Sequence, residues 1–428
     1  MRAPRRSRRS LWVALLAGAM PFEAGCASER DYGALACFDG WPAAPTPADA
    51  RTPLVTTPAI VWQANLSSDY SAERGLALAG DRIVTNEGTT LVAIDRMSGA
   101  QSFAVVLSSD SMPLGPPSVD QGGAIHVQSP TKRVVTLTPD GTTLSTAGPA
   151  GYWTSGGDPA VGWGLGLLVT SAEILAVSSN DQEALDTNGA TTWTTAYGSS
   201  IGIGHWGFGF DGSASYAVDL RNGRPAGRLR ANDGEDVQVL APFAGRGIAA
   251  FNAHIGSDFR LSLLDTCGHP AWSLKVRDGC ARIGGRVVGL GETIFMGTYS
   301  CSDPSDSSII GVAVDGRIVS GPVAREEGPW FVGADGVVYA VSSTLASLTA
   351  RLVALSPSLQ ELWHLDLPGA LADANPLLAD DGLLYMLIET TQGNAVLAVR
   401  TTSPGLAQSS WPTPKHDNQA SNWGGGSF

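Results

Sequence analysis

Charged side chains are scarce in this sequence, and basic ones are the scarcer kind. Only 16% of the 428 residues are charged, and 27 Lys and Arg stand against 40 Asp and Glu, a formal net charge of −13 at pH 7. A polyanion needs Lys and Arg to neutralise its phosphates, so this balance disfavours nucleic acid as a partner. No uninterrupted apolar run reaches roughly 18 residues, so we expect no membrane-spanning helix.

The motifs of common catalytic and metal sites are also absent from the sequence. It has no G-x-S-x-G nucleophile turn, no H-E-x-x-H pair among its six His, and no D-x-D-x-D-G calcium loop. The segment GIGHWG (202–207) fits G-x-G-x-x-G, but a chain with 52 Gly is expected to match it by chance. The sequence therefore predicts no catalytic residue, no cofactor and no metal.

The N-terminus has the pattern of an export signal. Five Arg lie within the first nine residues, and the apolar run Leu11–Met20 follows, too short to span a bilayer. Ala24 and Gly25 then precede Cys26, an ending that resembles a bacterial lipobox in which Cys26 is acylated; the usual Leu is replaced by Glu23. We expect residues 1–25 to be a signal peptide and the mature protein to be exported, with Cys26 as a candidate lipid anchor.

An internal repeat organises the rest of the chain. Alternating apolar residues run into an Asp, Asn or Gly turn and out into a second short strand, as in TTLVAIDRMSGAQSFAV and ASYAVDLRNGRPAGRL. The turn position recurs eight times, at Gly99, Gly141, Gly189, Gly223, Gly268, Gly316, Leu359 and Gly405. The mean spacing is about 44 residues, the length of a four-stranded propeller blade.

A tryptophan recurs four residues after the turn position in three copies: Trp193, Trp272 and Trp363. On an outer strand such a side chain can wedge between neighbouring blades, so we predict a structural role for each. The segment 60–66, with Trp62, reads as one further outer strand without inner strands before it. It is expected to complete the last blade, so that both chain ends share one sheet.

The sequence thus predicts an all-β fold, an eight-bladed β-propeller closed by an N-terminal strand. Seven blades are the alternative, because the copies at Gly189 and Gly223 are closely spaced. The expected organisation is a signal peptide (1–25), an N-terminal tether (26–59), the propeller (60–410) and a C-terminal closing segment (411–428).

The repeats VAIDRMSGAQSF, EALDTNGATTW and SLLDTCGHPAW resemble those of the pyrroloquinoline-quinone-like β-propellers. The C-terminal WPTPKHD also resembles a signature found at one end of such proteins, with Trp411, His416 and Asp417, read here as structural closure. The resemblance implies the fold. It does not imply the quinone, because the dehydrogenases of this fold are longer and carry an adjacent Cys pair that this chain lacks.

A propeller blade usually has four strands, A to D from the axis to the rim, so the B–C and D–A loops lie on one face of the ring and the A–B and C–D turns on the other. The position of each cysteine in this order therefore predicts the face on which it lies. Cys280 follows an outer strand and Cys301 lies in the next B–C loop, so both lie on one face and are favoured as a pair. Cys267 lies in a C–D turn on the opposite face, where the chain bearing Cys37 also arrives. Cys37–Cys267 is then the second expected disulfide, by elimination.

The B–C loops of the later blades are longer in sequence than those of the first two, and long loops on a rigid ring usually carry binding. We therefore predict a candidate binding face at His254, Asp258, Tyr299, Asp303, Asp306, Glu389 and Asn394.

Three functional classes fit the sequence. The preferred one is a non-catalytic propeller of the cell envelope or surface that acts as a protein-interaction scaffold, by analogy with the lipoprotein propeller of the outer-membrane barrel-assembly machinery. A quinone- or metal-dependent oxidoreductase and a carbohydrate-binding propeller are the alternatives. The expected partner is an unidentified envelope protein, with membrane association only through the lipid anchor.

Overall fold

The structure, a computed structural model, describes residues 37–43, 57–66, 75–109, 114–129, 133–147, 167–169, 174–177, 182–186, 190–195, 201–210, 214–231, 237–243, 245–252, 259–277, 281–300, 307–324, 329–344, 349–372 and 376–409. All regular elements within these ranges are β-strands. A search of the same ranges found no helix with the length and apolar character needed to cross a membrane.

The strands of the first half of the chain form four antiparallel four-stranded sheets, each in sequence order. They are β2 (Leu76–Ala79), β3 (Arg82–Glu87), β4 (Thr90–Asp95) and β5 (Gln101–Val106); β6 (Ser118–Val119), β7 (Ile125–Gln128), β8 (Val134–Leu137) and β9 (Thr143–Ala147); β10 (Leu167–Val169), β11 (Ile174–Val177), β12 (Gln182–Leu185) and β13 (Thr191–Thr195); β14 (Ile201–Ile203), β15 (Trp206–Phe210), β16 (Ser215–Asp219) and β17 (Arg224–Leu229).

The second half forms three more sheets of the same kind and one that includes the first strand of the chain. They are β18 (Val237–Phe243), β19 (Gly247–Asn252), β20 (Phe259–Leu264) and β21 (Pro270–Arg277); β22 (Ala281–Leu290), β23 (Thr293–Ser300), β24 (Ser307–Ala313) and β25 (Ile318–Ala324); β26 (Pro329–Val332), β27 (Val338–Thr344), β28 (Thr349–Leu355) and β29 (Glu361–Leu367); β30 (Ala370–Leu371), β31 (Leu377–Leu378), β32 (Leu383–Thr390) and β33 (Gly393–Arg400), with β1 (Ala59–Asn65).

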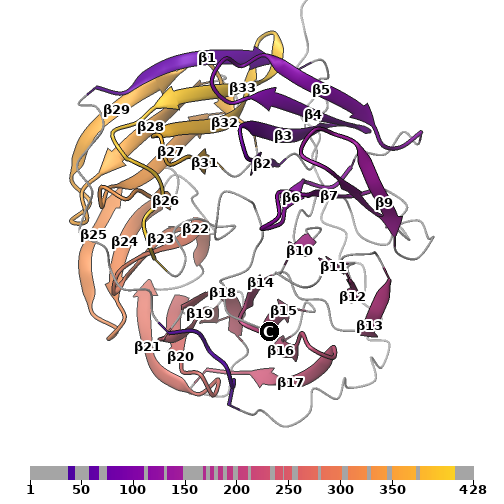
Figure 1. Cartoon of the computed structure of the whole chain (residues 1–428). Helices are drawn as coiled ribbons and strands as arrows, with labels where there is room; N and C mark the ends of the chain where they lie inside the picture. The colour runs from indigo at the N-terminus through magenta and orange to yellow at the C-terminus, as the bar shows by residue number, and fades with distance from the viewer. Residues whose placement is uncertain are drawn as a thin grey trace, which may run out of the picture. The chain divides into compact units, whose positions relative to one another are not determined.

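The sheets follow one another around a common centre, as Figure 1 shows. Inner strands of successive sheets touch: β2 contacts both β6 and β31, β6 contacts β10, and β18 contacts β14 and β22. The fold is therefore an all-β propeller. Its described strands make eight sheets, and the closely spaced copies that raised the seven-bladed alternative belong to two separate sheets, β10–β13 and β14–β17.

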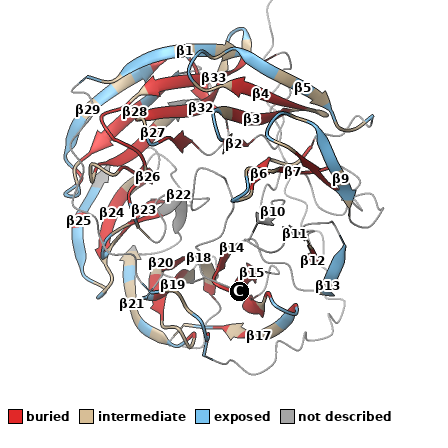
Figure 2. Ribbon diagram, in the orientation of Figure 1, coloured by how far each residue is buried: buried red, intermediate tan, exposed pale blue. Residues whose placement is uncertain are grey.

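The turn between the two outer strands explains why the repeat carries glycine. Gly99, Gly141, Gly223, Gly268 and Gly316 have φ between 70° and 89°, and Leu359, which stands in the same turn of the seventh sheet, has φ 61°. A side chain in this left-handed region crowds its own backbone, whereas glycine does not. The outermost strand that follows is half exposed, and the two middle strands are largely buried (Figure 2).

The first strand, β1, and the last strand, β33, belong to one sheet, as predicted for residues 60–66. Strand β1 pairs antiparallel with β33, with Trp62 opposite Ala398, and the N–H of Leu66 donates to the carbonyl of Asn394. After β33 the chain crosses to the preceding sheet, where the N–H of Ala407 donates to Val332 and the N–H of Ala334 donates to Gly405. The closing segment expected at 411–428, with Trp411, His416 and Asp417, lies outside the described residues.

Apolar clusters fill the interfaces between sheets. One joins β26–β29 to the last sheet, the next joins the last sheet to β2–β5, and a third joins β2–β5 to β6–β9. The outer-strand aromatics complete these interfaces by covering the turn glycine of the next sheet. A Cβ added to Gly99, Gly223 or Gly316 would lie 2.8, 2.5 or 3.0 Å from the ring of Trp62, Trp193 or Trp272. Glycine in the turn thus meets a second demand, the close approach of a ring, and Trp193 and Trp272 lie between neighbouring sheets, where a wedge was predicted.

Candidate functional site

The predicted binding face of B–C loops is only partly described. His254, Asp258, Asp303 and Asp306 lie outside the described residues, and Tyr299 is described only by its backbone, which pairs with Arg282 and Ser307. Glu389 and Asn394 face each other at the end of the β32–β33 hairpin.

Two expectations about this hairpin are wrong. Strand β32 ends at Thr390 and β33 begins at Gly393, so the segment read as a long loop is a tight turn. Asn394 is 2% exposed, and its carbonyl accepts the N–H of Leu66 at the ring closure, so its side chain is not open to a partner. Both errors have the same cause. A polar segment between two strands has the same sequence pattern whether it forms a long loop or continues the two strands into a tight turn.

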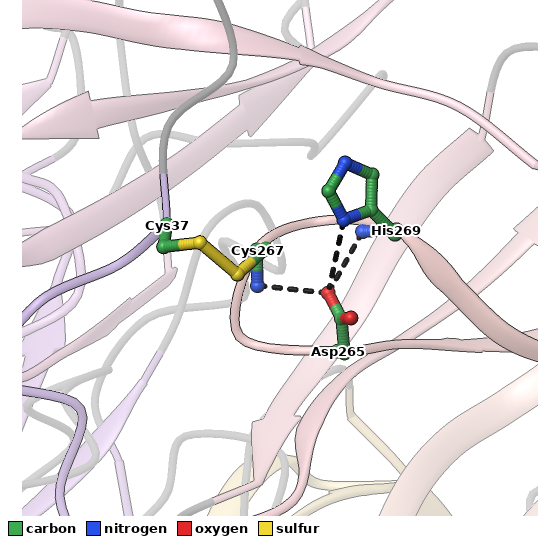
Figure 3. The surroundings of a disulfide bond; sticks show 4 residues. All are labelled: Cys37, Asp265, Cys267 and His269. Carbon is green, nitrogen blue, oxygen red and sulfur yellow. Dashed lines mark hydrogen bonds and ion pairs between the residues drawn. A yellow bond between two sulfur atoms is a disulfide. The ribbon is translucent and has the colours of Figure 1, made fainter.

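The cysteines give a clearer result. Cys37 and Cys267 form a disulfide, as expected when the cysteines were sorted by face (Figure 3). Cys267 lies in the turn between β20 and β21, just before the turn residue Gly268, and Cys37 belongs to residues 37–43, which we call the N-terminal strap. The other expected pair, Cys280 and Cys301, and the candidate lipid anchor Cys26 lie outside the described residues.

The strap is held to the sheet β18–β21 by its backbone as well as by the disulfide. The N–H of Phe38 donates to Thr266 over 2.7 Å, and the N–H of Gly245 donates to Pro42 over 2.7 Å. The indole N–H of Trp41 donates to the carbonyl of Phe243 over 3.0 Å. One end of the strap is thus bonded to the turn between β20 and β21, and the other end to the turn between β18 and β19.

The same strap is held to the neighbouring sheet β14–β17 through Asp39. Its carboxylate lies 3.0 Å from Nε2 of His205 and 3.4 Å from Nη1 of Arg221, and its backbone carbonyl accepts the indole N–H of Trp206. The hydrogen bond from His205 lowers the pKa of Asp39, and Arg221 adds to this effect. Arg221 is also paired with Asp219 over 2.7 Å, so a short network of charges crosses from the ring to the strap.

The aromatic side chains of the strap occupy the interface between these two sheets. Phe38 is 4% exposed and packs against Trp206 and Phe208, with ring centroids 5.0 and 5.6 Å away, and Trp41 stacks on Phe38 at 5.7 Å. Both belong to an apolar cluster that includes Ala226 and Leu229 from β17 and Val237 and Ile248 from the next sheet.

The place of the strap matches a gap in the repeat. In the first, third, fifth and seventh sheets the residue four positions after the turn is Phe103, Trp193, Trp272 or Trp363. In the second and sixth sheets it is Ser145 or Ser320, and in the sheet β14–β17 it is Gly227. That outer strand has no aromatic to place over the next turn, the one that contains Cys267 and Gly268. Phe38 and Trp41 supply the missing aromatic surface from elsewhere in the chain.

Three residues around the disulfide have the types found in metal sites. Asp265, Cys267 and His269 bring one ligand atom each within 4.8 Å of one another. Cys267 has no thiolate to offer while it is in the disulfide, and the Asp265 carboxylate accepts the backbone N–H groups of Cys267 and His269 (Figure 3). These contacts identify Asp265 as a residue that stabilises the turn.

Other polar clusters in the described residues also serve packing. His126 is 3% exposed and lies 3.1 Å from both Asp120 and the hydroxyl of Thr136. Burial raises the pKa of Asp120, but hydrogen bonds from His126 and the N–H of Ala124 outweigh this and lower it. The hydroxyl of Tyr339 donates to Asp335 over 3.1 Å, and burial raises the pKa of Tyr339. In both groups a turn carboxylate, Asp120 or Asp335, is bonded to a side chain of the strand that follows it, β7 or β27.

The rim has an asymmetric distribution of exposed apolar side chains. Five outer strands that follow one another around the ring, β25, β29, β1, β5 and β9, each carry one or two such residues, 43 to 70% exposed. They are Ile318, Val319, Leu362, Ile60, Val61, Val106 and Leu144, which we call the apolar rim arc. The described side chains of the remaining outer strands, β13, β17 and β21, include no exposed large apolar residue.

Comparison with known proteins gives likeness of fold. No family model and no curated protein sequence matches the chain. Among solved structures, a quinohemoprotein alcohol dehydrogenase from Pseudomonas putida is similar with a TM-score of 0.52 and 10% identity, covering 81% of this chain and 76% of that one. BamB from Moraxella catarrhalis is similar with a TM-score of 0.42 and 16% identity, covering 80% and 88%. The first of these likenesses agrees with the β-propeller fold that the sheets form.

The described residues do not fit the quinone held by the dehydrogenases of this fold. The dehydrogenases of this fold were expected to hold it over an adjacent Cys pair. The disulfide seen here joins residues 230 positions apart and lies in an outer-strand turn, and no two Cys are adjacent in the sequence. We therefore derive no quinone chemistry for this chain.

Proposed function

We propose that the chain is an exported, envelope-attached propeller that acts as a non-catalytic protein-interaction scaffold. The apolar rim arc is the observation that carries this proposal. Single exposed apolar residues are ordinary, but here they recur on five successive edge strands and are absent from the described side chains of the other three. A solvent-facing edge strand also offers unpaired backbone groups, to which a partner can add a strand.

The signal and anchor support the place of action. Export by residues 1–25 and acylation of Cys26 would hold the ring at a membrane surface, and a disulfide such as Cys37–Cys267 persists in an oxidising compartment. The expected partner is therefore another envelope protein with an apolar or extended binding surface.

Photo-crosslinking in intact envelopes tests the proposal. A photoreactive side chain is placed at Leu362 or Val106 in the arc, and at the exposed Thr194 on β13 as the matched control. We expect an adduct of one defined mass from both arc positions and none from Thr194. Leu362→Lys should abolish the adduct formed at Val106 while the midpoint of thermal unfolding stays unchanged. Equal labelling at all three positions would contradict the proposal.

The two alternatives have direct tests. Quinone added together with Ca²⁺ is expected to produce no absorbance change and no dye reduction, because the described residues offer no adjacent Cys pair to support it. A glycan array is expected to show no binding. A signal in either experiment would move the function to the corresponding class.

A further inference from the structure

The interface under the N-terminal strap is shaped for a peptide. The strap lies between two sheets, turns at Asp39 and Gly40, where Gly40 has φ 63°, buries Phe38, half-buries Trp41, and leaves Asp39 and Gly40 at the surface. Its contacts involve backbone groups, two aromatic side chains and one carboxylate. These are the elements by which a groove recognises a short peptide ligand.

We propose that this interface is a docking groove for a short peptide that turns between two aromatic side chains and carries an acidic one at the turn, filled by the strap in the oxidised protein and vacated when Cys37–Cys267 is reduced. The inference extends the scaffold role proposed above by naming a second binding surface and its ligand chemistry.

The groove is complementary to such a ligand in shape and charge. Phe208 and Trp206 form an aromatic floor, and Ala226 and Gly227 leave room where four other sheets place a Phe or Trp. His205 and Arg221 provide donors to an acidic side chain at one edge. The carbonyl groups of Thr266 and Phe243 accept from the ligand's backbone and indole N–H on the other side.

The disulfide controls whether the strap leaves the groove. Cys37 is exposed, so a reductant can reach it, whereas Phe38 beside it is buried in the groove. Exposed disulfides are the ones most open to thiol–disulfide exchange. A thiolate of a dithiol reductant attacks Sγ of Cys37 and releases the Cys267 thiolate, which takes up a proton. The second thiolate of the reductant then attacks its own sulfur in the mixed disulfide and releases Cys37. Two electrons pass from the dithiol to the protein, which gains two thiols while the reductant becomes a disulfide.

Hydrogen exchange on the wild-type chain tests this role of the disulfide. Amides of Phe38 and Gly245, which bond across the strap, should exchange at least tenfold faster after dithiol treatment and recover on reoxidation. Amides in β3, β4, β27 and β28 should be unchanged. Unaltered protection of the strap would overturn the proposal, and so would loss of protection throughout the ring.

Peptide binding tests the groove itself. The receptor is the full chain with Cys37→Ser, Phe38→Ala and Trp41→Ala, which disables the strap and leaves every groove residue in place. A synthetic peptide with the sequence of residues 38–43 should bind this receptor and the reduced wild type, but not the oxidised wild type. Replacing its tryptophan by alanine should weaken binding at least tenfold.

A folded receptor that does not bind the peptide would overturn the proposal. Should the receptor not fold, the exchange experiment and peptide binding to the reduced wild type decide. Failure of these tests leaves crosslinking through Leu362 and Val106 untouched, because the arc lies on other sheets, so the two proposals can fail separately.

Discussion

The indole N–H of Trp62 donates a hydrogen bond of 3.1 Å to the backbone carbonyl of Arg96. Trp62 belongs to the last sheet through β1, and Arg96 lies in the outer turn of the first, so this bond crosses the point where the ring closes. The hydroxyl of Tyr385 donates to the same carbonyl over 3.1 Å, and the Arg96 guanidinium lies 3.3 Å from Asp381. One residue of the first sheet is thus fixed by three side chains of the last.

Removing the Trp62 ring should therefore weaken the closure. Trp62→Ala is expected to lower the free energy of unfolding by about 3 kcal/mol, because a partly buried ring and its contact with Gly99 are lost. Trp62→Phe retains most of the contact and loses only the hydrogen bond, so about 1 kcal/mol is expected. Equilibrium denaturation measures both. Equal losses would show that the hydrogen bond, not the ring, is the main contribution.

Leu359 occupies the turn position at which other sheets have glycine, and it adopts a positive φ there, which is unfavourable for a residue with a side chain. Its side chain is 2% exposed and packs in the cluster between the sixth and seventh sheets, beside Gly321, where the outer strand of the sixth sheet carries Ser320 and no aromatic. The leucine thus fills from the turn side a space that a tryptophan fills elsewhere.

Two substitutions separate packing from backbone strain. Leu359→Ala should destabilise by about 2 to 5 kcal/mol, since the cavity remains and the left-handed conformation is retained. Leu359→Gly creates a slightly larger cavity but relieves a conformation that costs a non-glycine residue about 1 kcal/mol. We expect the glycine variant to be the more stable of the two in thermal denaturation. The reverse order would mean that the turn is not strained by leucine.

Much of the fold could be predicted from the sequence because the repeat encodes each sheet locally. Period-two alternation predicts the strands. The turns at Gly99, Gly223 and Gly316 require a positive φ, which glycine adopts readily, so the residues of the turn itself encode it. The pairing of β1 with β33 followed from a strand at 60–66 that had no neighbours of its own.

The strap could not be predicted in the same way. Phe38 and Trp41 contact residues more than 160 positions away, and no periodicity connects them to Trp206 or Phe243. The missing aromatic at Gly227 was no signal by itself, because Ser145 and Ser320 stand at the same position of the repeat; Cys267 in the following turn was the additional sign. The apolar rim arc was missed for another reason: Leu362 and Val319 read as ordinary strand residues, and only the ring arrangement shows that they lie on successive outer strands.

The register of the sixth sheet bears on the second cysteine pair. Ala281 and Ser300 are cross-strand partners at the ends of β22 and β23, and Cys280 and Cys301 are the next residues outward along the chain. Opposed residues of an antiparallel pair have Cβ atoms about 5 Å apart, close to the separation in a disulfide. We predict that Cys280 and Cys301 are linked in the oxidised protein.

Peptide mapping without reduction tests this link. A Cys280–Cys301 peptide should appear alongside a Cys37–Cys267 peptide, and both should disappear after reduction. The Cys301→Ser variant should lose the first and keep the second. Linkage of either cysteine to Cys37 or Cys267 would contradict the face assignment on which both pairings rest.

Acid should loosen the strap before it unfolds the ring. The pKa of Asp39 is held below its ordinary value of 3.8, first by the hydrogen bond from His205 and also by Arg221. A carboxyl with a lowered folded pKa contributes stability above its unfolded pKa and loses it as the pH falls through the folded pKa. The contribution of Asp39 to holding the strap is therefore present at pH 5 to 7, begins to weaken near the ordinary pKa of 3.8, and is lost as the pH falls through the lowered pKa.

The reduction rate of Cys37–Cys267 by a phosphine, compared with that of Asp39→Asn, isolates this effect. Both proteins meet the same reagent, so its own titration cancels in the ratio of their rates. At pH 5 to 7 the wild type should be reduced roughly twofold more slowly, since an exposed ion pair is weak. The two rates should converge in acid, once the pH is below the lowered pKa of Asp39. A ratio that stays constant across this range would show that the carboxylate of Asp39 does not help to hold the strap.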